Sequence, residues 1–291
     1  MQVFGYHLVE NIRELHQELV SGTYQHGGYY HFKIADPKPR DIHKASVRDR
    51  LVHHALYRQF YPFFDRTFIA DSYSCRLGKG THKAMNRLRS FAYQVSKNDT
   101  RTCWVLKCDI RKFFASIDQH VLMEVVRAYI PDVRIIALIG NIVSSFDSGI
   151  VEKGLPLGNL TSQLLVNIYM NEFDQFVKHE LKITHYVRYA DDFVILSCDR
   201  AYLFTTLSYM KVFLHDRLKL ELHPNKVSIQ TLASGVDFLG WVHFPDHRVL
   251  RTSTKRRMFE ALSGNPKEET VASYRGMLKH GNAHKLVRHT S

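Results

Sequence analysis

The chain has 291 residues, enough to bury a sizeable hydrophobic core in one multi-lobed unit or in two domains. Its 40 Lys and Arg residues outnumber 28 Asp and Glu residues, and the net charge of +12 suits a polyanionic partner, nucleic acid before an anionic membrane. The longest apolar run, near 135–143, is far shorter than the roughly 20 residues of a membrane-spanning helix, so no membrane partner is expected.

The cysteines and the N-terminus favour a cytoplasmic protein. The first residues turn polar quickly and offer no small-residue cleavage site, so no signal peptide is expected. The cysteines show no C-x-x-C spacing, which argues against a zinc site and for reduced thiols. They are Cys75, Cys103, Cys108 and Cys198.

Periodicity and turn residues divide the first hundred residues into helices around a β-rich stretch. The segment 46–49, Ser-Val-Arg-Asp, has the pattern of a capping box, which marks the start of a helix. In chain order we expect a helix over 8–19, a β-rich stretch over 27–42, a helix over 51–60, a loop at 78–80 and a helix from Thr81 to 95.

A buried strand is expected over 103–109, and it ends in a carboxylate, Asp109. Residues 116–118 then have the pattern of a helix N-cap before a segment with apolar residues at helical spacing. A lone Asp at the end of a strand is usually a cap or a turn residue. Asp109 is therefore a candidate catalytic residue only in combination with other acids.

Two adjacent carboxylates, Asp191 and Asp192, lie between two runs that alternate like β-strands. The sequence Tyr189-Ala190-Asp191-Asp192 predicts a tight hairpin turn that holds both acids at the tip of a sheet. Adjacent carboxylates repel each other, and they are costly to remove from water unless a cation neutralises them. Taken alone, such a pair is also typical of a solvated turn.

The three acids together define a candidate metal site. A strand-end Asp and a strand-turn Asp pair, far apart in sequence, can hold two metal ions about 3.5–4 Å apart. Mg²⁺ is the natural ion because it prefers carboxylate oxygens and is shared with substrate phosphates, and Mn²⁺ could substitute. Such a site activates a 3′-hydroxyl and stabilises the pyrophosphate leaving group, so the predicted reaction class is nucleotidyl transfer.

Seven segments then resemble the sequence blocks of reverse transcriptases, in the same order along the chain. They are 40–52, 74–81, 109–114 (block A), 154–163 (block B), 189–192 (block C), 223–226 (block D) and 238–240 (block E). The likeness spans about 35–245 and is closest to prokaryotic reverse transcriptases. It implies an RNA-directed DNA polymerase with an α+β right-hand fold of fingers, a palm with an antiparallel sheet, and a small helical thumb.

The resemblance also implies a domain division. Residues 1–100 would form the fingers, with 119–153 adding to the fingers or palm helices, and 101–245 would form the palm with the block A strand. In the palm we expect a block B helix over 161–178, a helix over 199–218 and short strands over 226–230 and 236–244. Residues 246–291 would form a short basic thumb on the template–product duplex.

By the same resemblance, Asp109, the backbone of Ile110, Asp191 and Asp192 would hold the metal ions. The positions that match nucleotide-binding residues of the family are Arg50, Arg76, Lys79, Phe113, Phe114, Leu157, Gly158, Gln163 and Lys226. Those expected to bind nucleic acid are Asn159, Arg251, Lys255, Arg256 and Arg257.

Several of these positions have plainer interpretations. Phe113 could be a core residue, whereas Phe114 matches the family's steric gate, where a ring collides with a ribose 2′-hydroxyl. The basic residues Arg50, Arg76 and Lys79 could be solvated surface charges rather than phosphate ligands. Lys226 could be a general acid near the leaving pyrophosphate or a surface lysine, and Asn159 and Gln163 could simply cap a helix.

Block B indicates the subgroup. Most relatives carry Pro-Gln-Gly there, whereas this chain has Pro156-Leu157-Gly158, continuing as Asn-Leu-Thr-Ser-Gln. That run resembles the reverse transcriptases of diversity-generating retroelements, which copy a template RNA with frequent errors at adenines. A leucine side chain has shape but makes no hydrogen bond, so the enzyme should select correctly paired nucleotides less strictly. The alternative is that leucine only compensates for a packing change nearby.

The resemblance implies template RNA, a DNA or RNA primer, dNTPs and a small basic accessory protein as partners. Two rival hypotheses remain open. One is a defence-associated or unknown-group prokaryotic reverse transcriptase, untemplated or protein-primed. The other is an inactive RNA-binding scaffold, against which the intact set of three acids argues.

Overall fold

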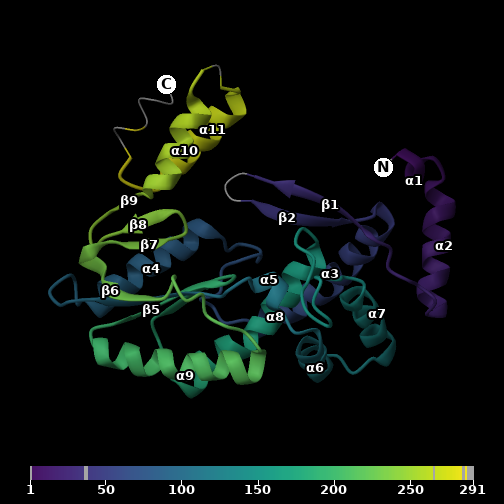
Figure 1. The fold of residues 1–291 in the computed structure, drawn as a ribbon, viewed down its shortest axis with the longest axis horizontal. Helices are drawn as coiled ribbons and strands as arrows, with labels where there is room; N and C mark the ends of the chain where they lie inside the picture. The colour runs from purple at the N-terminus through teal and green to yellow at the C-terminus, as the bar shows by residue number, and fades with distance from the viewer. Residues whose placement is uncertain (1, 36–38, 265, 284–285, 287–291) are drawn as a thin grey trace. The chain divides into compact units, whose positions relative to one another are not determined.

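The protein is described by a computed structural model that covers residues 2–35, 39–264, 266–283 and 286 (Figure 1). The chain forms two compact units, each assembled from several segments. Unit 1 comprises 1–70, 110–181 and 210–222, and unit 2 comprises 71–109, 182–209 and 223–291. Asp109 and Ile110 are therefore peptide neighbours that belong to different units.

Unit 1 is mainly helical. Its elements are α1 (Gln2–Tyr6), α2 (Leu8–Ser21), β1 (Tyr29–Ile34), β2 (Arg40–Ala45), α3 (Val47–Thr67), α5 (Phe113–Ser116), α6 (Gln119–Tyr129), α7 (Val133–Ser144), α8 (Leu160–Gln175) and the π-helix η1 (Phe176–Glu180). Strands β1 and β2 form an antiparallel pair in which Tyr29 lies opposite Ala45 and Ile34 opposite Arg40. The predicted N-terminal cap is confirmed, because the Ser46 side chain accepts a hydrogen bond from the Asp49 amide at the start of α3. The Asp49 carboxylate accepts from the Ser46 hydroxyl and not, as in a full capping box, from the Ser46 amide.

Helix α8 is the central helix of unit 1. It is buried on nearly all sides, including Leu164, Ile168 and Phe173, which is typical of a helix enclosed by other helices. Helix α3 packs along it. The sequence predicted one helix over 161–178, and the structure corrects its end: the helix changes to π geometry from Phe176.

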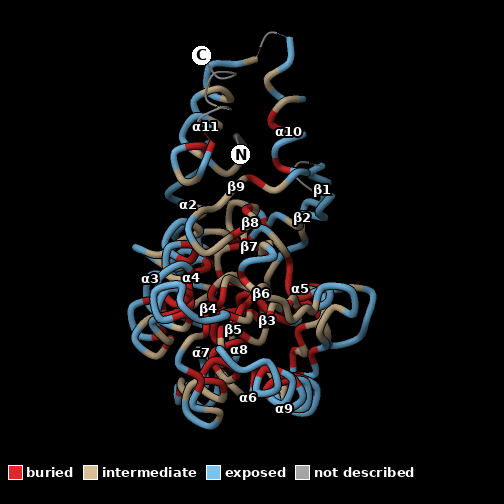
Figure 2. The backbone as a smooth tube through the Cα atoms, turned by 90° about the vertical axis from the view of Figure 1, so that its left-hand side faces the viewer, coloured by how far each residue is buried: buried red, intermediate tan, exposed pale blue. Residues whose placement is uncertain are grey.

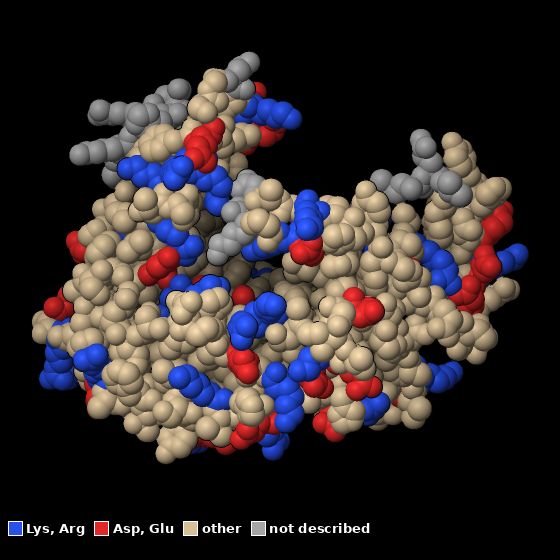
Figure 3. Space-filling view, viewed as in Figure 1, with Lys and Arg blue, Asp and Glu red and all other residues tan. Residues whose placement is uncertain are grey.

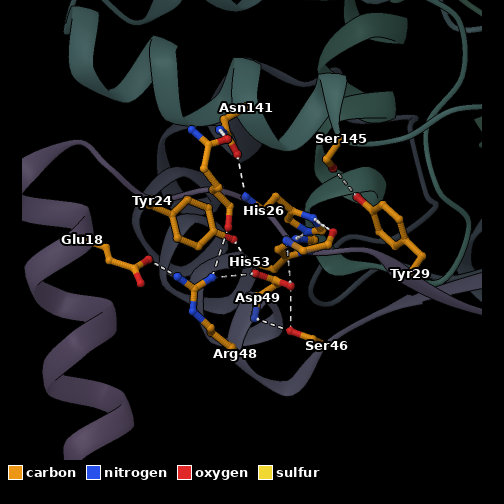
Figure 4. Close-up of polar contacts among 12 residues, drawn as sticks. Glu18, Tyr24, His26, Tyr29, Ser46, Arg48, Asp49, His53, Asn141 and Ser145 are labelled. Atoms are coloured by element: carbon orange, nitrogen blue, oxygen red, sulfur yellow. Dashed lines mark hydrogen bonds and ion pairs between the residues drawn. The ribbon is translucent and has the colours of Figure 1, made fainter.

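A buried polar network lies between the N-terminal segment and α3 (Figure 4). Asp49, only 1% exposed, accepts hydrogen bonds from the Tyr24 hydroxyl (2.8 Å) and from the Ser46 hydroxyl (2.6 Å). The ring of His53 is held from both sides, with Nε2 3.0 Å from Nε2 of His26 and Nδ1 3.0 Å from Oγ1 of Thr161. Burial, and then the nearby His26, lowers the pKa of His53 to about 4.

Unit 2 contains two antiparallel sheets and their helices. Its elements are α4 (Thr81–Val95), β3 (Trp104–Asp109), β4 (Tyr186–Tyr189), β5 (Asp192–Ser197), β6 (Ser228–Thr231), the 3-10 helix η2 (Leu232–Ser234), β7 (Val236–Phe238), β8 (Trp241–His243), β9 (Arg248–Leu250), α10 (Thr252–Leu262) and α11 (Glu268–Leu278). Helix α9 (Arg200–Leu218) begins in unit 2, and its second half belongs to unit 1.

The first sheet of unit 2 has the strand order β4-β5-β3-β6. Helix α4 lies on one side of it and the first half of α9 on the other (Figures 1 and 2). Both faces are therefore buried, and Val105, Leu106 and Cys108 on β3 are fully enclosed. The buried residues of these strands form the red centre of Figure 2.

The second sheet has the order β7-β8-β9 and packs with α10 and α11. Trp241, Leu250, Met258 and Leu278 form their shared core. The helical character expected for the basic tail is confirmed by α10 and α11, whereas the division into fingers, palm and thumb stays a prediction. Within the described residues, no helix is long and apolar enough to span a membrane.

Candidate active site

Asp109 and Asp192 are register partners on the neighbouring antiparallel strands β3 and β5. Strand β3 ends at Asp109 and strand β5 begins at Asp192, so both acids lie at the same edge of the sheet. Tyr189 pairs with Asp192 across the β4–β5 hairpin, which leaves Ala190 and Asp191 as a two-residue turn. The predicted hairpin is thereby confirmed, and Ala190 takes a positive φ of 56° to close it.

The carboxylate of Asp192 is poorly satisfied. Its side chain is 18% exposed, and its Oδ1 is buried without a hydrogen bond to any described residue, with Lys107 Nζ 3.8 Å away. Burial raises the pKa of Asp192 to about 7; Lys107 opposes this shift, while Asp109 and Asp191 add to it. A buried carboxylate in this state gains from a nearby cation.

Asp109 is held by block D. Its Oδ1 accepts a hydrogen bond from Lys226 Nζ at 2.7 Å, and its backbone carbonyl accepts one from the His223 amide at 2.7 Å. The side chain of Asp109 is 15% exposed and that of Lys226 41%. The lysine therefore neutralises Asp109 in the protein alone.

These residues fit a hard divalent cation by their chemistry. They offer only oxygen donors, and one buried oxygen of Asp192 has no hydrogen-bond partner among the described residues. In the described part of the chain, however, no three His, Cys, Asp or Glu side chains are grouped so that they could hold a metal ion. Ile110, whose backbone was a predicted ligand, forms an isolated bridge with Leu222 in unit 1.

In unit 1, Phe114 and Leu157 line one cavity of about 430 Å³. Phe114 is partly exposed, whereas Phe113 is buried with 4% of its surface exposed. The plainer interpretation of Phe113 as a core residue therefore agrees with its burial. The roles of both rings toward a nucleotide stay predictions.

The block B turn is fixed against β2. The Leu157 carbonyl accepts a hydrogen bond from the His43 amide at 2.9 Å. Gly158 has a φ of 110°, a conformation that favours glycine. A Cβ at this position would also lie 2.8 Å from Cγ2 of Ile42, so there is no room for a larger residue. These contacts set the position of Leu157 at the cavity wall.

Asn159 and Gln163 begin α8. Asn159 is 2% exposed, and its side-chain amide donates to the His43 carbonyl (2.6 Å) and accepts from the Ala45 amide (3.1 Å). It stands at the N-cap position but makes no side-chain cap bond. Gln163 is partly exposed. The nucleotide and nucleic-acid roles of these two residues stay predictions.

Two histidines to which no role was assigned from the sequence share the cavity with Phe114 and Leu157. His31 and His43 are opposite each other on β1 and β2, with ring centroids 4.8 Å apart, and His31 Nε2 lies 2.9 Å from Asp41 Oδ1. Burial, and then His31, lowers the pKa of His43. Only the strand register brings these residues together, and no sequence spacing indicates it.

The basic residues predicted to clasp a triphosphate have different surroundings. Arg50, in unit 1, is partly buried, and its Nε makes no hydrogen bond to a described residue. In unit 2, Arg76 Nη1 donates to the Ser72 carbonyl at 3.0 Å, and Lys79 Nζ lies 5.1 Å from the ring centroid of Tyr73. Their binding roles stay predictions.

Lys and Arg side chains gather near the base of α10 (Figure 3). Of the four residues predicted to bind nucleic acid there, Arg251 is paired with Asp237 and Arg256 with Glu260. Lys255 is exposed, with Nζ 5.9 Å from the Phe259 ring centroid, and Arg257 is partly exposed. Their nucleic-acid roles stay predictions.

Known proteins resemble this chain in sequence and in fold. The profile of the family described as "Reverse transcriptase (RNA-dependent DNA polymerase)" matches residues 34–243. Protein YkfC of Escherichia coli (strain K12) is 27% identical over 303 residues, which cover 90% of this chain and 77% of that protein. The group II intron-encoded protein LtrA of Lactococcus lactis subsp. cremoris is 24% identical over 335 residues, covering 90% of this chain.

The solved structures include apo telomerase from Candida tropicalis truncated from its C-terminal domain. Its TM-score is 0.59 at 10% sequence identity, over 84% of this chain, and this likeness concerns the fold alone. The chain spans 53% of the length of LtrA and 60% of that telomerase chain. The expected α+β polymerase fold is confirmed, and the chain belongs to the reverse transcriptase family, the RNA-dependent DNA polymerases.

Proposed function

We propose that this protein makes cDNA from a template RNA by two-metal nucleotidyl transfer. The observation that carries the proposal is the register of β3 against β5, which sets Asp109 opposite Asp192, with Asp191 in the adjoining turn. Three carboxylates at one sheet edge suit a reaction in which phosphate oxygens and cations meet. One of them, Asp192, has a buried oxygen with no hydrogen-bond partner among the described residues.

Asp109, Asp191 and Asp192 would hold two Mg²⁺ ions, with the backbone of Ile110 as a further ligand. When bound, Mg²⁺ would neutralise these acids and the negative charge of the transferring phosphate. Lys226 is already within hydrogen-bond distance of Asp109, so it would be near enough to give a proton to the leaving pyrophosphate.

The cavity in unit 1 supports a nucleotide pocket. Phe114 would exclude a ribose 2′-hydroxyl by collision, and Leu157 would form an apolar wall that offers no hydrogen bond. His31 and His43 line the same cavity and would add polar edges to it. The proposed substrates are therefore dNTPs, on a primer paired with template RNA.

We further propose that the enzyme is error-prone and belongs to a diversity-generating retroelement, where its cDNA rewrites a variable gene. Leu157 supports this proposal, because a wall without directed hydrogen bonds penalises a misplaced base pair less than a glutamine would. The partner in this setting would be a small basic accessory protein.

Replacing Leu157 with Gln tests the proposal. cDNA made with the accessory protein should carry errors concentrated opposite template adenines, and Leu157→Gln should reduce them several-fold, since one hydrogen bond is worth about 1 kcal/mol. Leu157→Met is the matched control, because it keeps an apolar side chain of similar size. Low, evenly spread errors in all three proteins would refute the mutagenic role and favour a defence-associated enzyme, untemplated or protein-primed.

A second candidate is an intron-encoded reverse transcriptase. The similarity to the group II intron-encoded protein LtrA over 90% of this chain favours it. The gene's surroundings separate the candidates: a template and variable repeat pair indicates a diversity-generating element, and a flanking group II intron indicates an intron protein. An inactive RNA-binding scaffold would show no primer extension with Mg²⁺ or Mn²⁺.

A further inference from the structure

A second cavity, of about 290 Å³, lies within unit 2 and is distinct from the predicted active site. It is enclosed by α4, the β8–β9 turn and the segment that follows α11. The charged and titratable residues used below are Arg89, Asp246, His247, Arg248, Lys279 and His280. Lys and Arg outnumber acids here, so the cavity has a positive potential.

Arg248 is held rigidly at the cavity wall. Its Nε donates to the His280 carbonyl and its Nη2 donates to Asn86 Oδ1 at 3.1 Å. The chain after α11 is fixed in turn, because the Asn282 amide donates to the Arg248 carbonyl at 2.8 Å. The third nitrogen, Nη1, is buried and has no hydrogen-bond partner among the described residues.

No carboxylate of the described chain balances this guanidinium. Arg89 adds a second positive charge, and its Nη2 donates to the Asp246 carbonyl at 3.4 Å. The Asp246 carboxylate is bonded to His247 Nδ1 at 2.7 Å. Burial, and then repulsion by Arg89, lowers the pKa of Arg248, so its charge is held at a cost in free energy.

Another arginine in the same unit provides the contrast. Arg251 donates from Nε to Asp237 Oδ1 at 2.8 Å and from Nη2 to the same oxygen, which neutralises its charge. Arg248 has the same donor groups, but it lines a cavity, whereas Arg251 is paired with a carboxylate. An anion in the cavity would offset the positive charges of Arg248 and Arg89 and reduce the repulsion between them.

We propose that this cavity binds a phosphate group, with Arg248 in its wall and the exposed Arg89 and Lys279 beside it. Guanidinium groups match phosphate oxygens in geometry and remain charged, which suits a site with no carboxylate partner. The phosphate could belong to the backbone of a bound RNA strand or to a free phosphate compound. The proposal does not depend on the polymerase mechanism, since none of its residues belongs to the proposed catalytic site.

Arg89→Gln is the first test variant, because Arg89 is exposed on α4 and its loss should leave the fold intact. Arg101→Gln is the matched control, since it removes one exposed arginine of the same unit outside the cavity. Isothermal calorimetry should show that the unmodified protein binds inorganic phosphate saturably. EDTA is present to remove divalent metal ions. Arg89→Gln should weaken that binding by about tenfold, the loss of one charge-assisted hydrogen bond, and Arg101→Gln should not.

Binding of a single-stranded RNA oligonucleotide, also in EDTA, identifies the source of the phosphate. If Arg89→Gln weakens RNA binding more than Arg101→Gln does, and inorganic phosphate competes with the RNA, the ligand is a strand phosphate. If only phosphate binding changes, the ligand is a free phosphate compound. Arg248→Lys should reduce phosphate binding further, because lysine lacks the planar set of N–H donors of a guanidinium group. An unchanged melting temperature would show that this variant is folded.

Equal behaviour of Arg89→Gln and Arg101→Gln toward both ligands would overturn the proposal. Catalytic failure would not affect the result, because neither titration requires Mg²⁺ or extension. Conversely, a positive result would not support the polymerase proposal if the unmodified protein failed to extend a primer.

Discussion

Lys226 Nζ lies 2.7 Å from Oδ1 of Asp109, which joins a residue of block D to the strand-end acid of block A. The lysine compensates the negative charge that a metal ion would compensate in the working enzyme. Since the Lys226 side chain is 41% exposed, this ion pair contributes little stability and can exchange readily. A cation could therefore replace the lysine beside Asp109 at little cost in stability.

We predict that Asp109→Asn or Asp191→Asn abolishes primer extension on RNA with Mg²⁺. Each substitution removes an anionic metal ligand and leaves the basic surface unchanged. Primer extension and RNA binding should be measured on the same preparations, and RNA binding should remain close to that of the unmodified protein. Extension near the original rate in either variant would contradict the two-metal assignment.

Phe114→Ala should improve the use of ribonucleotides by roughly ten- to a hundredfold while dNTP use is retained, because the collision with the 2′-hydroxyl is lost. Single-nucleotide incorporation of rNTPs and dNTPs measures the ratio. Phe113→Ala is the contrasting variant: Phe113 is 4% exposed, so its loss should cost about 3–5 kcal/mol of stability. Unchanged sugar selectivity in Phe114→Ala would mean that the gate lies elsewhere.

RNA binding without sequence preference should weaken by at least about tenfold between 50 and 200 mM salt, because neutralised phosphates release counterions. The exposed residues Lys255 and Arg256 offer a check, since the double change to Gln should reduce the slope of log affinity against log salt. Fluorescence anisotropy at several salt concentrations measures both. A flat salt dependence would show that the net charge of +12 is not used for binding.

Stability should fall on acidification from about pH 6.5 to about pH 4 because of His53 (Figure 4). Its pKa is lowered in the folded protein, so the unfolded chain binds more protons over this range and stability is lost as pH falls. The groups that face it are His26, Asp49 and His54, of which only Asp49 raises its pKa. The contribution is up to about 3 kcal/mol.

Chemical denaturation at pH 7.5 and pH 5 compares the unmodified protein with His53→Gln. The variant should lose less stability on acidification than the unmodified protein does. His54→Gln serves as the control, because it removes the adjacent histidine, which is exposed. Identical acid sensitivity of all three proteins would show that His53 is not the responsible group.

The amino-acid sequence alone was enough to predict the local elements of this protein and its family. Alternation around Asp191 and Asp192 predicted the hairpin, and the Ser46–Asp49 pattern predicted the start of α3. Both depend on residues close together in the chain, whose spacing and capping chemistry act over one or two turns. The ordered blocks predicted the reverse transcriptase family in the same way, as short segments with recognisable side chains.

The tertiary structure decided which distant residues meet. The register that sets Asp109 opposite Asp192, the bond from Lys226 to Asp109 and the approach of Arg89 to Arg248 all join positions more than 80 residues apart. Two local features were not predicted either. They are the short helix α5, which follows Lys112 with its φ of 46°, and the π-helix η1, which follows α8. Local periodicity contains no information on such partners, because strand register and side-chain burial are set by how whole elements pack.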